Sequence, residues 1–173
     1  METWTAIRTK RMVRRFDDRP LTAAHLKRIL DVGRHAGSSK NLQRWSFIVV
    51  DDRAQLRALA AVGPYASHVA GAAVAVALVT PDPHGPGAPL SVLWDLGIAA
   101  QNMMLAAWEL GIGSCPATIY EPAMAKELLG YPDDQACEYL LSFGYPANPE
   151  DLTRAPKAGG RRSLEEIVHR DRW

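Results

Sequence analysis

The sequence predicts a single domain of the α+β class. A chain of 173 residues has the length of one domain and can bury a sizeable hydrophobic core. Segments with helical and with strand patterns follow one another without strict alternation, which favours α+β over a doubly wound parallel sheet. Residues 90–110 form the longest predicted helix and are apolar on most faces. We therefore expect residues 1–173 to fold around a long helix that other elements, or a partner chain, must cover.

Helix start and stop signals place the elements of the first half. Thr3 is a candidate N-cap for a helix over residues 3–11, and Pro20 in FDDRPL interrupts the helical pattern. Thr22 is a candidate N-cap for a second helix, whose apolar stripe consists of Leu26, Ile29, Leu30 and Gly33. The segments expected next are the loop HAGSSKNLQRW, a strand at SFIVVDD, a helix at about residues 52–61 and a buried strand at 72–80.

Proline and glycine delimit the long helix. The sequence PDPHGPGAP, residues 81–89, is too rich in these two residues for regular structure and predicts a loop before the helix. The helix over 90–110 ends at LGIGSC, where Gly111 or Gly113 can adopt a positive φ as a C-cap.

The last third of the chain carries three further signals. Pro122 at the N1 position and Gly130 at C′ frame a helix across EPAMAKELLG. The segment YLLSFGYP predicts another strand. The sequence SLEE at residues 163–166 has the spacing of a capping box, which predicts a short terminal helix.

The charge balance gives no global reason to expect a nucleic acid or a membrane as a partner. The chain has 20 Lys and Arg against 19 Asp and Glu, a formal net charge of +1. The N-terminus has no apolar run that could serve as a signal peptide. The most apolar stretch, residues 92–113, contains Asp95, Gln101, Asn102 and Glu109, which makes it a poor membrane span and a good buried helix.

The two cysteines, Cys115 and Cys137, form neither a CxxC pair nor a metal-ligand spacing with histidine. We therefore expect a reduced, cytoplasmic setting and no metal site. The five histidines are scattered, and the sequence has no HExxH, GxSxG, P-loop or GxGxxG motif. No sequence-local base or cation activates Cys115, so we do not expect a catalytic thiol.

A local cluster of cations stands out against this neutral background. The segment KRMVRRF places Lys10, Arg11, Arg14 and Arg15 within six positions. Three interpretations are open: a solvated helix end, a nucleic-acid patch, or a site for a small phosphorylated ligand. A second basic pair, Arg161–Arg162, favours the third interpretation, because arginine forks suit phosphate oxygens and two distant segments could converge on one phosphate.

Two further segments have both a structural and a functional interpretation. The loop GSSKNLQRW is either a polar turn or a set of hydrogen-bonding groups for a ribityl chain or a heteroaromatic edge. The segment GIGSCPATIY is either a helix C-cap followed by a turn or a small-residue backbone that a flat ligand can approach closely.

The order of these segments resembles the flavin-dependent nitroreductase family over nearly the whole chain. The resemblance is carried in order by KRMVRRFDDRPL, AGSSKNLQRWSFIVV, DLGIAAQNMMLAAWELGIGSCPATIY, KELLGYP, LLSFGYP and RRSLEEIVH. It implies a nitroreductase-like fold with a central, mostly antiparallel sheet flanked by helices, and a long buried central helix. It also implies a homodimer that binds FMN at the subunit interface.

The resemblance also implies which residues hold the FMN. Basic side chains of the N-terminal motif would hold the phosphate and the pyrimidine edge, with help from the C-terminal arginines. The loop of Ser38, Ser39 and Asn41 would come from the partner subunit. The full implied set is Lys10, Arg11, Met12, Arg14, Ser38, Ser39, Asn41, Gln43, Pro116, Ala117, Thr118, Arg161 and Arg162. The sequence departs from the family pattern at Met12, where a serine is more usual, and at Arg44 and Ser163, where prolines are.

The function implied is an FMN-dependent oxidoreductase that uses NAD(P)H to reduce small aromatic acceptors, such as nitroaromatics or quinones, by a ping-pong mechanism. The flavin carries the chemistry at N5, so no catalytic side chain is expected. Two alternatives stay open: a flavin-dependent dehydrogenase of a specific metabolite, and a flavin-binding or flavin-storage protein without net turnover.

Overall fold

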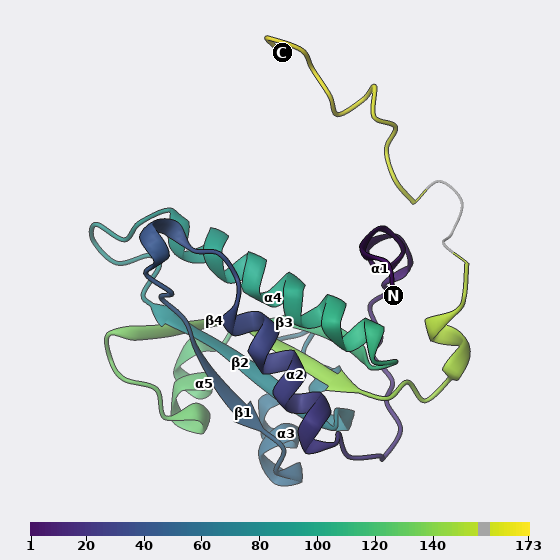
Figure 1. Cartoon of the computed structure of the whole chain (residues 1–173). Helices are drawn as coiled ribbons and strands as arrows, with labels where there is room; N and C mark the ends of the chain where they lie inside the picture. The colour runs from purple at the N-terminus through teal and green to yellow at the C-terminus, as the bar shows by residue number, and fades with distance from the viewer. Residues whose placement is uncertain (156–159) are drawn as a thin grey trace.

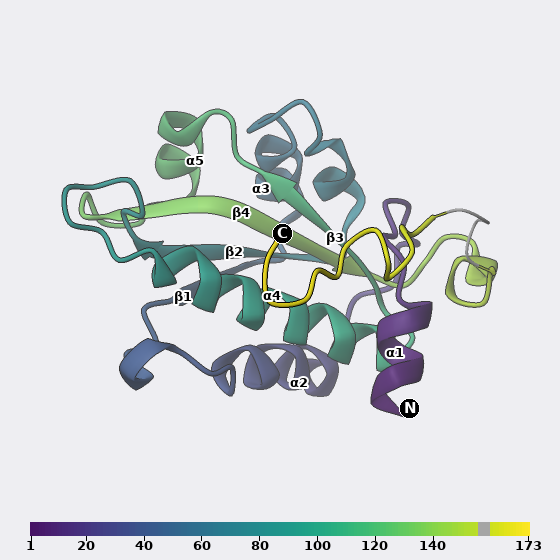
Figure 2. The same cartoon turned by 90° about the horizontal axis from the view of Figure 1, so that it is seen from above.

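The protein is built around a four-stranded antiparallel sheet with the strand order β1-β2-β4-β3 (Figures 1 and 2). The computed structural model describes residues 1–155 and 160–173. The strands are β1 (Ser46–Val50), β2 (Val74–Pro81), β3 (Gly113–Thr118) and β4 (Gln135–Gly144). All three pairings are antiparallel, with a register shift between Leu78 and Val79 where β2 meets β4. The expected α+β class and the mostly antiparallel sheet are confirmed.

Helices cover both faces of this sheet. Figures 1 and 2 show α2 and α4 on one face and α3 and α5 on the other. The helices are α1 (Thr3–Thr9), α2 (Ala23–Arg34), α3 (Arg53–Leu59), α4 (Ser91–Glu109) and α5 (Pro122–Leu129). Three short 3₁₀ turns complete the regular structure: η1 (Ser39–Asn41), η2 (Ser67–Gly71) and η3 (Pro149–Leu152).

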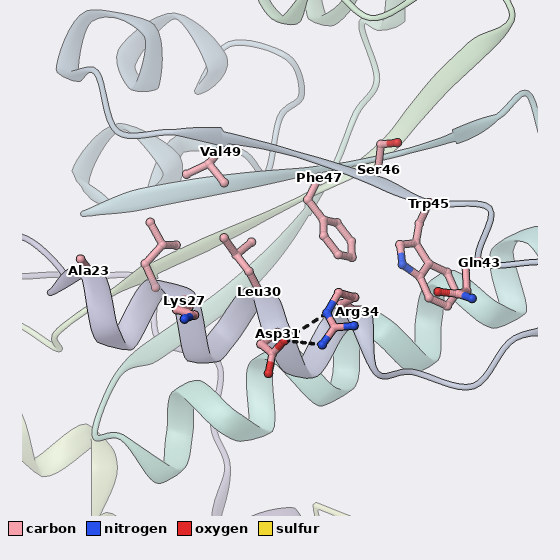
Figure 3. Close-up of a pocket in the computed structure, with 11 residues that line it drawn as sticks. Ala23, Lys27, Leu30, Asp31, Arg34, Gln43, Trp45, Ser46, Phe47 and Val49 are labelled. Carbon is pink, nitrogen blue, oxygen red and sulfur yellow. Dashed lines mark hydrogen bonds and ion pairs between the residues drawn. The ribbon is translucent and has the colours of Figure 1, made fainter.

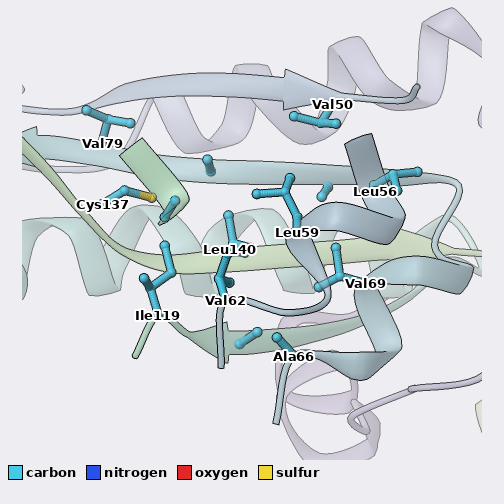
Figure 4. Packing of buried hydrophobic residues seen from close by; sticks show 14 of the residues in the cluster. Val50, Leu56, Leu59, Val62, Ala66, Val69, Val79, Ile119, Cys137 and Leu140 are labelled. Carbon is cyan, nitrogen blue, oxygen red and sulfur yellow. The ribbon is translucent and has the colours of Figure 1, made fainter. Parts of the chain in front are cut away.

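Strand β2 is buried on both sides, which explains its unbroken run of β-branched and small residues. Val74, Val76 and Leu78 face α2 and α4, where they pack with Ile29 and Met103. The alternate residues face α3 and α5 in a second cluster (Figure 4). That second cluster includes Ala75, Ala77, Val79, Leu56, Leu59, Val69, Ile119 and Leu140.

Several of the predicted helix boundaries are confirmed by their hydrogen bonds. The side chain of Thr22 accepts from the backbone N–H of His25, and Asp52 caps α3 by accepting from Gln55. Gly111 after α4 has φ +74° and Gly130 after α5 has φ +68°, as C-cap glycines require. The N-cap of α1, however, is Glu2 rather than Thr3, which is the first helical residue.

Two segments differ from what the sequence suggested. The segment GSCPAT at residues 113–118, for which a turn was one of two open interpretations, is the edge strand β3. Proline is tolerated there because an edge strand leaves one row of N–H groups without a ladder partner. The predicted helix at 163–166 is a turn: Ser163 and Glu166 make the reciprocal hydrogen bonds of a capping box, but no helix follows.

The long helix α4 is buried along the side that packs on the sheet and on α2, where Ala99 and Met103 are fully enclosed. Its other side is open in the single chain: Trp94 is 74% exposed and Ile98 is 36% exposed. Among the helices that the structure describes, α4 included, none has the length and apolarity needed to cross a membrane.

Candidate functional site

The N-terminal basic segment lies directly beside β3. The backbone N–H of Val13 donates to the carbonyl of Ser114 over 3.0 Å, and Met12 and Ser114 form a parallel bridge. This close approach requires a glycine, because a Cβ on Gly113 would lie 2.5 Å from the Cβ of Val13. Val13 is buried, so alternation along the extended segment turns Met12 and Arg14 away from the core. The structure therefore places residues 10–14 beside the start of the strand that also carries residues 116–118.

Lys10 is the most unusual cation of this segment. Its Nζ lies 3.3 Å from the sulfur of Met12 and 3.5 Å from the sulfur of Met104. Thioethers are weak acceptors, and no carboxylate within the described residues pairs with Lys10. Burial lowers the pKa of the Lys10 ammonium below its usual value, although the nearby thiol of Cys115 acts in the opposite direction. Lys10 is thus a part-buried cation that lacks an anionic partner in this part of the chain.

The two arginines of the segment differ in what they contact. The Nη1 of Arg11 donates to the backbone carbonyls of Arg8 and Lys10 at 3.0 Å each, which satisfies groups at the end of α1. The exposed guanidinium of Arg14 makes no hydrogen bond to the described residues. Its positive charge is close enough to lower the pKa of both Cys115 and His68.

A buried polar layer that no sequence motif indicates lies against β3. The hydroxyl of Ser142 on β4 donates to the carbonyl of Cys115 over 3.1 Å, and Nδ1 of His68 lies 2.8 Å from the same hydroxyl oxygen. His68 is on η2, 74 positions before Ser142, so no local motif links the two residues. Burial raises the pKa of the Cys115 thiol despite the opposing charges of Arg14 and Lys10, which agrees with the expectation that this thiol is not a nucleophile.

The loop of Ser38–Gln43 is a compact and strained structure. Three of its residues have left-handed backbones: Lys40 at φ +53°, Asn41 at +55° and Gln43 at +47°. Internal bonds support this shape, including one from the backbone N–H of Gln43 to the hydroxyl of Ser38 over 3.0 Å. Strain of this kind is typical of ligand-binding loops that the surrounding structure holds in place.

One anchor of that loop is Asp95 on α4, whose carboxylate accepts from the backbone N–H of Ser39 over 2.9 Å. Asp95 is 3% exposed, and no sequence motif marks it as a site residue. Met104, beside Lys10, lies on the same helix nine positions further on, which corresponds to roughly 13 Å along the axis. Within one chain, the loop and Lys10 therefore lie at opposite ends of α4.

The C-terminal arginines also lie apart from the other cations in a single chain. Figure 1 shows residues 160–173 running away from the folded body. Arg162 pairs with Glu166 inside this tail over 3.4 Å, and Arg161 donates to the carbonyl of Gly160. The predicted convergence of Arg161 and Arg162 with Lys10 on one phosphate is not present within one chain and stays a prediction.

A hollow of about 750 Å³ lies elsewhere, between α2 and β1 (Figure 3). It is mostly apolar and includes Leu30, Trp45 and Phe47, with an ion pair between Arg34 and Asp31 at 2.8 Å. Gln43 lines it, whereas the basic segment and β3 do not. Within residues 1–155 and 160–173, no group of three potential metal ligands comes together.

Comparisons with known proteins agree with this architecture. A family profile described as "Nitroreductase family" matches residues 7–79 and 61–145. A protein of Archaeoglobus fulgidus, provisionally named an NADH dehydrogenase/NAD(P)H nitroreductase, is 32% identical, with 96% of each chain covered. The NADPH-flavin oxidoreductase of Vibrio harveyi is 30% identical over 89% of this chain and 70% of its own. The crystal structure of nitroreductase A from Vibrio parahaemolyticus is similar to this chain with a TM-score of 0.85 and 26% sequence identity, and the match covers 100% of this chain and 77% of that chain.

The family match covers both parts of the site described above: it begins within α1, before the basic segment, and extends past β3 to the end of β4. The profile match across most of the sequence and the relative that is 32% identical over 96% of each chain lead to one conclusion. This chain belongs to the nitroreductase family.

Proposed function

We propose that the protein is an FMN-dependent oxidoreductase that uses NAD(P)H to reduce small aromatic acceptors such as nitroaromatics or quinones. The observation that carries this proposal is Lys10, a part-buried ammonium whose neighbours are two thioether sulfurs rather than an anion. A bound phosphate would supply the missing negative charge. The name of the Vibrio harveyi relative, NADPH-flavin oxidoreductase, supports the same cofactor class and the same donor class.

The residues of the candidate site fit the chemistry of FMN. Lys10 would hold the phosphate together with an arginine of the C-terminal tail, and Arg14, with its unengaged guanidinium, would face the pyrimidine edge. The backbone of Pro116, Ala117 and Thr118 would lie against the flat ring system, since small side chains leave that strand accessible. Met12, exposed beside Lys10, contributes a polarisable surface where a hydroxyl is more usual in the family.

Bound FMN supplies the two-electron chemistry, and this chain supplies position and charge. The cation of Arg14 stabilises negative charge that develops on the neighbouring pyrimidine edge. We expect no side chain to be an obligatory acid or base, and His68, which contacts β4 near the site, is buried. The donor and the acceptor would use the same open face in turn, which predicts ping-pong kinetics.

A homodimer completes this proposal. The loop of Ser38, Ser39 and Asn41 lies at the far end of α4 from Lys10, so it would meet the flavin of a second copy rather than its own. The open side of α4 supports this arrangement, since the exposed Trp94 and Ile98 form an apolar surface that a partner chain could bury. We also propose a cytoplasmic location, because Cys115 and Cys137 are both free thiols.

The first experiment is the visible absorbance spectrum of the purified protein, followed by extraction of any chromophore and an assay for NAD(P)H oxidation. We expect a yellow protein that releases FMN on denaturation and oxidises NAD(P)H with a quinone or nitroaromatic acceptor. A yellow protein without turnover would favour the flavin-storage alternative, and turnover with a single metabolite only would favour a specific dehydrogenase. A colourless protein that does not take up added FMN would overturn the proposal.

A further inference from the structure

A hollow of about 560 Å³ lies between the basic segment and η3, and arginines dominate its lining. The arginines are Arg14 and Arg15 from the basic segment and Arg154, which follows η3. Asp151 contributes a carboxylate to the same lining and pairs with Arg154 over 3.3 Å. The lining residues therefore carry three positive charges against one negative charge.

Backbone hydrogen bonds hold the two walls of this hollow. The N–H of Ala147 donates to the carbonyl of Arg15 over 3.0 Å, so the chain after the basic segment is tied to the chain after β4. On the other wall, the N–H of Arg154 donates to the carbonyl of Glu150 in η3 over 2.8 Å. The arginines thus project from backbone that is fixed by its own hydrogen bonds.

The guanidinium groups of Arg14 and Arg15 are exposed and make no hydrogen bond or ion pair with the described residues. Like charges that line one hollow repel each other, and a bound anion would reverse the sign of that interaction. Arginine is also the residue whose planar fork best matches phosphate oxygens. The chemistry of the hollow is therefore that of a site for a phosphate monoester.

Two phosphate monoesters could occupy such a site: the phosphate of FMN and the 2′-phosphate of NADPH. The proposed ligand of the FMN phosphate, Lys10, lies against the sulfurs of Met12 and Met104 and does not line the hollow. Arg14 does line it, and the same cation is close enough to act on Cys115 of β3. The hollow thus borders the candidate flavin site without including Lys10, which favours the electron donor as the occupant.

We propose that Arg15 and Arg154 bind the 2′-phosphate of NADPH and make the protein selective for NADPH over NADH. This inference rests on the proposed function, which leaves the choice between the two donors open. The 2′-phosphate is the group that distinguishes NADPH from NADH, so a cation that binds it changes the relative rates with the two donors. The ribose and diphosphate groups that join it to the nicotinamide let it bind beside the flavin site.

Steady-state kinetics with both donors test the two arginines. We expect Arg15→Gln and Arg154→Gln each to raise the KM for NADPH about tenfold, the scale of a lost hydrogen bond to a charged group. The kcat with NADPH and both constants with NADH should stay at the wild-type values. Arg57→Gln is the matched control, because it removes an exposed arginine of α3 that does not line the hollow. Equal losses with NADPH and NADH would contradict recognition of the 2′-phosphate.

Asp151 provides a test in the opposite direction. Asp151→Asn removes the negative charge of the hollow and frees Arg154 from its ion pair. We expect the KM for NADPH to fall about threefold, the scale of one exposed charge interaction, while the KM for NADH stays constant. The gain should diminish as the salt concentration rises. A loss of activity with both donors would show that Asp151 has only a structural role and would contradict the proposal.

A binding measurement that needs no turnover completes the test. By calorimetry, 2′,5′-ADP should bind the wild-type protein at least about tenfold more tightly than 5′-AMP, which lacks the 2′-phosphate, and Arg15→Gln should remove this difference. A wild-type protein that oxidises NADH as well as NADPH would overturn the inference. So would an Arg15→Gln variant that binds FMN more weakly but keeps its donor preference, because the hollow would then hold the FMN phosphate. If the wild-type protein oxidises neither donor, it is the proposed function that fails.

Discussion

At the residue scale, Lys10, Arg11 and Arg14 belong to one basic cluster but differ in burial and in hydrogen-bond partners. The ammonium of Lys10 is part-buried against two sulfur atoms, and burial lowers its pKa. Arg11 is engaged with the backbone at the end of α1, whereas Arg14 is open to solvent. Three of the four cations of the cluster therefore differ in role: Lys10 lacks an anionic partner, Arg11 supports the backbone, and the guanidinium of Arg14 is available to a ligand.

We predict that Lys10→Met weakens FMN binding by about 1.5–3 kcal/mol, the free energy of a charged hydrogen bond. Methionine keeps most of the side-chain volume but cannot bind the phosphate. Arg11→Met is the matched control: it removes a neighbouring cation whose Nη1 already serves two carbonyls, so a smaller loss is expected. Titration of FMN into the cofactor-free variants measures both. A larger loss in Arg11→Met would move the phosphate contact from Lys10 to Arg11.

Sequence reasoning found the cations but not the residues that support them. A run such as KRMVRRF is visible because charges cluster along the chain. His68 and Asp95 were not visible as site residues, because their partners Ser142 and Ser39 are far away in the sequence. Supporting contacts of this kind depend on tertiary structure, and a pattern of neighbouring residues does not contain them.

At the element scale, β3 is a second case in which the local sequence does not predict the structure. Its sequence GSCPAT has small residues and a proline, features that predict a turn when they follow a helix and a C-cap glycine. The segment is nevertheless a strand, because it pairs with six residues of β4 over its whole length. By contrast, β2 was predictable, since burial on both faces demands a continuous apolar run.

We predict that Gly113→Ala disturbs the site through the backbone. The new Cβ would lie 2.5 Å from the Cβ of Val13, so the basic segment must move away from β3. We expect a lower unfolding temperature and weaker FMN binding, on the scale of about 1–3 kcal/mol for an overpacked position. Gly37→Ala is the control, because a Cβ there meets nothing within 4 Å. Thermal unfolding that is the same for both variants would contradict this close contact.

We predict that Asp95→Ala releases the loop of Ser38–Gln43. The backbone N–H of Ser39 loses its acceptor, and nothing else within the described hydrogen bonds joins that N–H to α4. Hydrogen exchange at Ser39 should become faster, and FMN should bind more weakly if the loop contacts it. Glu109→Ala is the control: it removes an exposed carboxylate of the same helix, paired with the N-terminal amine, and should leave exchange in the loop unchanged.

At the scale of the whole molecule, the apolar composition of α4 predicts more burial than a single chain provides. Its composition predicts cover on all sides, yet one side, with Trp94 and Ile98, is open. The sequence therefore predicts a requirement for cover, and one chain does not meet it. Lys10 and the Ser38–Gln43 loop are also separated along α4 within one chain. In a dimer, Lys10 of one copy and the loop of the other could contribute to one site.

We predict that the protein is a dimer of about 38 kDa in solution, twice the 19.0 kDa of the chain. Trp94→Lys places a charge on the open side of α4 and should shift the mass measured by light scattering toward the monomer, with loss of bound FMN. Tyr65→Lys is a control with similar exposure, 72%, on another surface, and should keep the wild-type mass. A wild-type monomer that retains FMN would contradict both the dimer and the shared site.

The position of β3 at the edge of the sheet also determines when the site can form as the chain is synthesised. β3 pairs with β4 and with the short bridge at Met12, while β4 is made later, at residues 135–144. Until residue 144 has left the ribosome, the strand beside the basic segment has no ladder to join, although β1 and β2 are already available to pair. The cofactor pocket should therefore assemble in one late step together with the completed sheet, and a nascent chain that stops before β4 should be unable to capture FMN.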